Sequence, residues 1–188
     1  MKAYIAAPFF NARELAVVER VEGMLDAAGI EYFSPRTLGR PNDADERREI
    51  FDTNYNHIMD CDIVLAWLDR IHADDRLSVR MVRDVTDIHP PQAALGSSYT
   101  IDSGPLIQPD LGTVWEMGAV YALDRPCVGF THHTTPTDAR LNLMLAESVD
   151  GIVYGLDQLE KMLTKPLTRW GSFYNVWIGK GDEDVECT

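Results

Sequence analysis

The chain has 188 residues, of which 45% are hydrophobic, and its formal net charge is −13. This length supports a single hydrophobic core, so we expect one domain over residues 1–181, followed by an acidic and mobile end over residues 182–188. Nucleic acid and anionic membrane surfaces would be repelled by the charge, which leaves small molecules and other subunits as partners.

The cysteines and the first residues indicate a cellular compartment. Cys61, Cys127 and Cys187 are scattered and form no C-x-x-C pair, which fits free thiols in a reducing environment. The chain starts directly with an apolar run, without a signal-peptide pattern, and no apolar run approaches membrane-spanning length. We therefore expect a cytoplasmic protein.

Strand and helix patterns alternate along the first third of the chain. Tyr4 to Ala7 is an apolar run that ends at Pro8, and Asn11 with Glu14 resembles a capping box that opens a helix. Gly29 stops this helix. A strand over residues 30–33, a helix over 45–59 and a strand over 62–67 follow.

Residues 70–109 interrupt the alternation. They are too long for an ordinary α/β connection, so we interpret them as an insertion that forms a lid, an interface arm or a partly disordered segment. The alternation resumes with a helix over 112–123, a strand over 127–130, a helical turn over 139–147, a strand over 151–154 and a helix over 156–163. The pattern predicts an α/β fold, with a mostly parallel five-stranded sheet and helices on both faces.

Aromatic residues are dense near the C-terminus, at Trp170, Phe173, Tyr174 and Trp177. A solvated end would not need them. They favour a subunit interface or a ligand wall, and packing against the domain's own sheet is the alternative.

The segment from Asp110 to Gly118 places two carboxylates and a glycine at the start of a helix, where open α/β sheets bind small molecules. Glu116 lies about one turn into this helix, below Gly112, which leaves the space above the carboxylate open. The field of the helix start favours the ionised carboxylate that a nucleophile requires. The alternative is that Asp110 only caps the helix and Glu116 only complements the dipole.

No metal-binding or cofactor-binding motif is apparent. His132 and His133 are adjacent in a loop, the other histidines lack ligand spacing, and the chain has neither a G-x-G-x-x-G nor a Walker-type loop. We expect no metal ion and no cofactor.

Four motifs together resemble the nucleoside 2-deoxyribosyltransferase family. In chain order they are Tyr4-Ile-Ala-Ala-Pro-Phe-Phe10, Asp60-Cys-Asp-Ile-Val64, Asp110-x-Gly-Thr-x-x-Glu116-x-Gly118 and Leu141-Asn-Leu-Met-Leu145. The resemblance implies a flavodoxin-like doubly wound fold and a homo-oligomer with shared active sites. It also implies an enzyme that moves 2-deoxyribose between the free nucleobases and deoxyribonucleosides it binds, through a covalent deoxyribosyl-enzyme intermediate.

The resemblance also implies catalytic roles. Glu116 matches the nucleophile, and Tyr4 matches the tyrosine that holds its carboxylate. Asp62 and Asp110 match acidic residues near the base and sugar, one of which protonates the leaving base. Glycosidic cleavage needs an anion below the anomeric carbon and a proton donor at the leaving group. Because neighbouring carboxylates repel each other, we expect Glu116 to be ionised and the aspartate to keep its proton.

Three further residues are implied to bind substrate. Phe9 is similar to aromatic residues that stack on the base, and Asn142 matches an asparagine that a neighbouring subunit donates to the sugar 5′-hydroxyl. Gly112 leaves room for the substrate above Glu116. The long insertion and the C-terminal region depart from the family pattern.

Two other functions remain open. A hydrolase of the same superfamily would release the base from deoxynucleosides or their 5′-monophosphates by using water, although Asn142 argues for an uncharged 5′-hydroxyl. A non-catalytic nucleoside or nucleotide sensor would keep the fold for recognition only.

Overall fold

The computed structural model describes residues 1–69, 109–132 and 143–173. They contain one five-stranded parallel sheet with the strand order β2-β1-β3-β4-β5. The strands are β1 (Lys2–Ala6), β2 (Glu31–Phe33), β3 (Ile63–Trp67), β4 (Cys127–Thr131) and β5 (Gly151–Tyr154). This is the order of a flavodoxin-like doubly wound fold, so the predicted fold class is confirmed.

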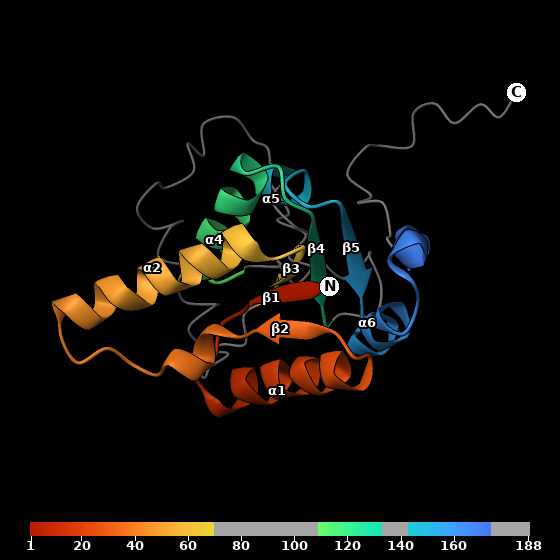
Figure 1. Ribbon diagram of the computed structural model, residues 1–188. Helices are drawn as coiled ribbons and strands as arrows, with labels where there is room; N and C mark the ends of the chain where they lie inside the picture. Colours follow the sequence, from red (N-terminus) through yellow and green to blue (C-terminus); the bar gives the residue numbers. More distant parts are fainter. Residues whose placement is uncertain (70–108, 133–142, 174–188) are drawn as a thin grey trace, which may run out of the picture.

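Helices cover both faces of the sheet (Figure 1). One face carries α1 (Ala12–Ala27) and α6 (Leu156–Leu163), and the other carries α2 (Ala44–Asp60) and α4 (Leu111–Ala122). The shorter helices are η1 (Pro35–Leu38), α5 (Leu143–Ala146) and η4 (Leu167–Phe173). The face covered by α2 and α4 is the one that concerns the candidate site.

The central strand β3 contributes to both hydrophobic cores. Successive side chains of a strand point to opposite faces, so Ile63, Leu65 and Trp67 pack in the core under α1 and α6. Val64 and Ala66 pack in the core under α2 and α4. Because a parallel strand is covered on both faces, its sequence is continuously apolar instead of alternating.

The first helix has the ends that its sequence predicts. Asn11 Oδ1 accepts hydrogen bonds from the backbone N–H groups of Arg13 and Glu14, each over 3.0 Å, and Glu14 Oε2 accepts one from Phe10 N over 2.8 Å. Gly29 follows the helix with a φ of 67°, in the left-handed region that glycine adopts without strain.

For Trp170, the structure distinguishes between the roles suggested for the C-terminal aromatic residues, which were an interface or ligand wall and packing against the domain's own sheet. It is 1% exposed in the core under α1 and α6, and its Nε1 donates to the Lys165 carbonyl over 3.0 Å. For Trp170 the alternative of packing against the domain's own sheet is therefore correct. The predicted insertion up to residue 108 and the acidic end lie outside the described residues.

Candidate active site

The predicted nucleophile is hydrogen-bonded to a buried tyrosine. Tyr4 lies in β1 and is fully buried, and its hydroxyl donates to Glu116 Oε1 on α4 over 2.6 Å. Burial, reinforced by the nearby Glu116 charge, raises the pKa of Tyr4, so the phenol stays protonated and remains a donor. The two residues are 112 positions apart, so their contact depends on the packing of α4 over the sheet.

The pKa of Glu116 bears on the sequence prediction that this carboxylate is ionised. Burial of this half-buried side chain is the main reason why its pKa is raised to about 7; the Tyr4 hydrogen bond acts to lower the pKa, and the Asp110 charge acts to raise it. The field of a helix is strong only in its first turn, and Glu116 is the sixth residue of α4. Loss of hydration, which the sequence prediction of an ionised Glu116 did not include, therefore affects this pKa more than the helix start does.

Asp110 is the N-cap of α4. Its Oδ2 accepts a hydrogen bond from Gly112 N over 2.8 Å, and its carbonyl accepts one from Val114 N over 2.9 Å. A Cβ atom at Gly112 would lie 3.0 Å from Asp110 Oδ2, so the glycine leaves room for the cap. The capping interpretation is thus correct for Asp110, and the charge of Asp110 also acts on Glu116.

Asp62 does not join this group. It precedes β3 at the amino ends of the strands, where its 61% exposed side chain accepts a hydrogen bond from Lys2 N over 2.7 Å. It borders a cavity of about 960 Å³ that Met1 and Lys165 also line. Because α4 leads into a parallel strand, its start lies at the opposite, carboxyl edge of the sheet. Asp62 therefore anchors the start of a strand, away from Asp110.

The residues expected to bind substrate are also separated. Phe9 packs against the core under α1 and α6, with its ring centroid 5.3 Å from that of Phe10. Glu116 bonds to Tyr4 on the other face of the sheet, so this arrangement does not support base stacking by Phe9. Asn142 lies outside the described residues.

Two polar residues on the helices that cover this face of the sheet were missed by the sequence analysis. Asn54 Oδ1 on α2 and Thr113 Oγ1 on α4 are buried and have no hydrogen-bond partner within the described part of the chain. Asn54 lies one turn before Ile58, which packs in the same core as Tyr4, and Thr113 lies one turn before Glu116. Buried polar atoms are normally paired with protein, water or ligand. Their signal in the sequence is a polar residue at core-facing helical spacing.

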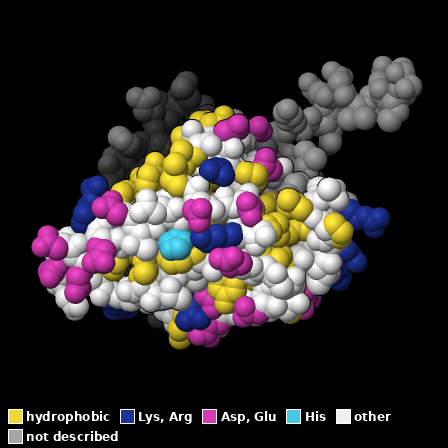
Figure 2. All heavy atoms as spheres, viewed as in Figure 1, with side chains coloured by type: hydrophobic (Ala, Val, Ile, Leu, Met, Phe, Trp, Pro, Cys, Tyr) yellow, Lys and Arg dark blue, Asp and Glu magenta, His cyan; other side chains and the backbone are white. Residues whose placement is uncertain are grey.

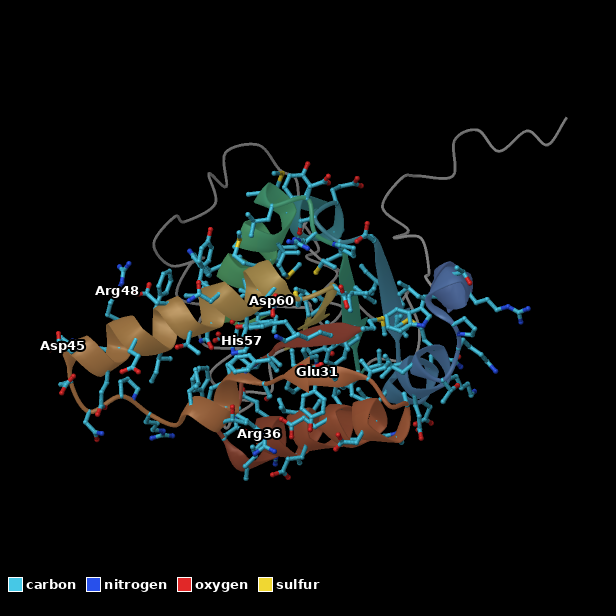
Figure 3. All side chains as sticks on the ribbon, viewed as in Figure 1. Glu31, Arg36, Asp45, Arg48, His57 and Asp60 are labelled. Carbon is cyan, nitrogen blue, oxygen red and sulfur yellow. The ribbon has the colours of Figure 1, made fainter. Side chains whose placement is uncertain are left out.

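The outer side of α2 carries other charged groups, separate from the group at Glu116. Figure 3 shows Asp45 and Arg48 near the start of α2, and His57 and Asp60 near its end. Within the described ranges, no three His, Cys, Asp or Glu side chains converge as a metal site requires. Nor does any helix described in these ranges have the length and apolar character needed to cross a membrane.

Comparisons with known proteins agree with the fold. The family model described as nucleoside 2-deoxyribosyltransferase matches residues 3–79, whereas a search of curated proteins found no match. A solved 2-deoxyribosyltransferase from Bacillus psychrosaccharolyticus is 24% identical, with a TM-score of 0.60 over 90% of this chain and 96% of that one. A conserved protein from Enterococcus faecalis V583 is 18% identical, with a TM-score of 0.55 over 87% of this chain and 96% of the other.

These two structures show the same fold, and the family match covers two of the four motifs, those at Tyr4 and at Asp60 to Val64. The family whose model matches residues 3–79 is the one that the four motifs resemble.

Proposed function

We propose that the protein is an enzyme that transfers the 2-deoxyribosyl group between nucleobases of 2′-deoxyribonucleosides, with Glu116 as the nucleophile. The observation that carries this proposal is the 2.6 Å hydrogen bond from buried Tyr4 to Glu116, next to the charge of Asp110. The family match supports the class of substrate.

The first half-reaction forms a covalent intermediate. Glu116 Oε2 attacks C1′ of the deoxyribose while the N-glycosidic bond breaks, and the base leaves with the bonding electrons and takes up a proton. Tyr4 orients the carboxylate through its bond to Oε1. Asp110, in its protonated form, is the proton donor in this scheme, because it lies close enough to Glu116 for the two carboxyl groups to interact. The product is a deoxyribosyl ester of Glu116.

The second half-reaction regenerates the enzyme. A ring nitrogen of the incoming base attacks C1′, the ester bond breaks, and Glu116 leaves as a carboxylate. The proton displaced from that nitrogen passes to Asp110. Two successive inversions at the anomeric carbon give a product with retained configuration.

Incubation of deoxyinosine with free adenine tests the proposal. The wild-type protein is expected to form deoxyadenosine, and Glu116→Gln is expected to lose this rate by about 10³-fold or more, because an amide cannot form the ester. Glu160→Gln, which changes an exposed carboxylate on α6, is the matched control and should keep the rate. Circular dichroism shows whether each variant is folded.

Other outcomes would contradict the transfer. Release of hypoxanthine and deoxyribose without deoxyadenosine would indicate an N-glycoside hydrolase of deoxynucleosides or their 5′-monophosphates. Nucleoside binding without any base release would indicate a non-catalytic sensor. Exchange by Glu116→Gln near the wild-type rate would exclude Glu116 as the nucleophile.

The proposal includes assembly as a homo-oligomer. It is supported by an aromatic cluster of Phe51 and Tyr55 on α2 and Trp115 on α4, each at least 37% exposed. The ring centroids of Phe51 and Trp115 lie 5.0 Å apart. Exposed aromatic side chains that gather in this way are typical of subunit interfaces. Because Trp115 precedes Glu116, such an interface would border the candidate site.

A further inference from the structure

The first turn of α4 carries a buried hydroxyl group that has no role in the proposed reaction. Thr113 is 2% exposed, and its Oγ1 is buried without a hydrogen-bond partner among the described residues. A threonine inside a helix commonly bonds to the backbone carbonyl three or four residues earlier. Thr113 does not make that bond. Because buried hydroxyl groups are normally paired, this one is available to another acceptor.

The helix brings Thr113 next to the proposed nucleophile. Thr113 and Glu116 are three residues apart on α4, a spacing that makes their side chains neighbours on one helix face, with Cβ atoms about 5–6 Å apart. Helical side chains lean toward the N-terminus, so Glu116 extends back over the turn that contains Thr113. The effect of the Asp110 charge on Glu116 agrees with this direction, because Asp110 is the N-cap of the same helix.

Thr113 lies on the side of Glu116 from which Tyr4 approaches. Thr113, Met117 and Val120 are the buried residues of α4, and Met117 and Val120 pack in the core that contains Tyr4. Tyr4 donates to Glu116 Oε1 from this core. The carboxylate oxygen that Thr113 would meet is therefore Oε1, which can accept a second hydrogen bond. Oε2 stays free for the anomeric carbon.

We propose that Thr113 is a positioning residue, whose hydroxyl donates a second hydrogen bond to Glu116 Oε1 when this carboxylate is charged. The movement required is a rotation about the Cα–Cβ bond of Thr113, between two rotamers that threonine uses in helices. The inference rests on the proposed function, because it concerns the charged nucleophile of that reaction. With Tyr4 and Thr113 on one oxygen, the carboxylate is held in place and presents Oε2 to the sugar.

The surroundings of Glu116 favour a second donor. Burial raises the pKa of Glu116 to about 7 and the Asp110 charge acts in the same direction, whereas the hydrogen bond from Tyr4 acts to lower it. Among the described elements that pack against α4, β3 adds apolar residues to this core, and burial raises the pKa of Cys127 on β4, which keeps the thiol neutral. Tyr55 on α2 belongs to the exposed aromatic cluster. A hydroxyl that donates to a carboxylate stabilises its charged form.

Titration of the Glu116 carboxyl by carbon-13 NMR tests this hydrogen bond in the folded protein without requiring activity, and Glu116→Gln assigns the signal. Thr113→Val keeps a similar side-chain shape and removes the hydroxyl, so it is expected to raise the midpoint of the Glu116 titration by about one pH unit. Thr113→Ser keeps the hydroxyl and should restore the wild-type midpoint. Thr53→Val is the matched control, because Thr53 borders a cavity of about 360 Å³ on the side of α2 that carries His57 and Asp60.

The pH dependence of base exchange is the second measurement. Because the proposed reaction needs a charged Glu116, the exchange rate between deoxyinosine and adenine should fall as the pH drops through the same midpoint. Thr113→Val should move this acidic limb to higher pH by the same amount, and Thr113→Ser should not. A residue that only packs in the core would not move the limb. Thr113→Ala replaces Thr113→Val if the latter does not fold.

Three results would contradict these expectations. An equal Glu116 midpoint in folded Thr113→Val and in the wild type would overturn the inference, as expected if an internal water satisfies the hydroxyl. A midpoint raised as much by Thr113→Ser as by Thr113→Val would also overturn it, because serine retains the donor. A wild-type protein that exchanges no bases at any pH would overturn the proposed function, and the NMR titration would still decide whether Thr113 bonds to Glu116.

Discussion

At the scale of single residues, Glu116 is subject to two conflicting requirements. Burial raises its pKa to about 7, which makes the charged form costly, while the proposed reaction needs that charged form. The hydrogen bond from Tyr4 reduces the conflict without removing it. Stability lost at a reactive group is a common feature of enzyme sites.

We expect Glu116→Gln to stabilise the folded protein at alkaline pH. A carboxyl with a pKa of about 7 when folded, against about 4.3 when unfolded, contributes stability at low pH that is lost as the pH rises through 7. Glutamine keeps an acceptor for Tyr4 and does not ionise. At about pH 8 the free energy of unfolding should therefore exceed that of the wild type by about 1 to 3 kcal/mol.

Urea unfolding at about pH 8 and about pH 5 measures this difference, which should shrink at the lower value. Glu160→Gln, at an exposed position, should show no such pH dependence. A Glu116→Gln variant no more stable than the wild type at the higher pH would show that burial does not dominate at Glu116.

At the scale of elements, α4 brings the candidate site together. Met117 and Val120 bury one side of this helix in the core that contains Tyr4, and this packing carries Glu116 to the Tyr4 hydroxyl. The Asp110 cap and the missing side chain at Gly112 decide where the helix starts. The same aspartate thus caps α4 and places a charge near Glu116.

Two substitutions at Asp110 separate its two roles. Asparagine is as good an N-cap as aspartate, whereas alanine loses the cap and about 1 kcal/mol of stability. Asp110→Asn should therefore keep the melting temperature, yet lower the base-exchange rate by about 10²–10⁴-fold if Asp110 transfers the proton. Asp110→Ala should lose both.

Thermal unfolding and the deoxyinosine–adenine exchange assay measure these two effects on the same samples. If Asp110→Asn exchanged bases near the wild-type rate, Asp110 would be a helix cap only, and another group would have to protonate the base.

At the scale of the whole molecule, net charge and surface composition have opposite effects on association between copies of the chain. The net charge of −13 keeps copies apart, and Figure 2 shows acidic side chains over the start of α2, where Asp45 and Glu46 occupy the first turn. The aromatic cluster interrupts this polar surface farther along α2, at Phe51 and Tyr55. Association through this cluster would bury apolar area without bringing the first-turn carboxylates of two copies into direct contact.

Phe51→Glu is expected to convert an oligomer into smaller species, because it places a charge inside the aromatic cluster. Sedimentation velocity measures the change. Leu167→Glu adds the same charge at an exposed position on η4 and is the matched control. A wild-type protein that sediments as a monomer, or a Phe51→Glu variant that sediments like the control, would contradict this interface.

How much of the site could be predicted depends on whether the sequence pattern involves only neighbouring residues. Periodicity and caps are local, so the strands, their parallel arrangement and the Asn11 cap followed from neighbouring residues. The positions of Asp62 and Phe9 could not be predicted in this way, because a motif identifies residues but not the edge or the face of the sheet on which they lie. His132 was considered only as a metal ligand, and its contact with Asp69 spans 63 positions.

By itself, the sequence determined the alternation of strands and helices, the charge, and the motif that holds Asp110, Gly112 and Glu116, because these depend on composition and short-range spacing. The family resemblance implied that Tyr4 holds Glu116, whereas only the tertiary structure decided that Asp62 lies at the other edge and that Asp69 is buried against His132. It also decided that the pKa of Glu116 is raised, because loss of hydration is set by everything that packs around a carboxylate.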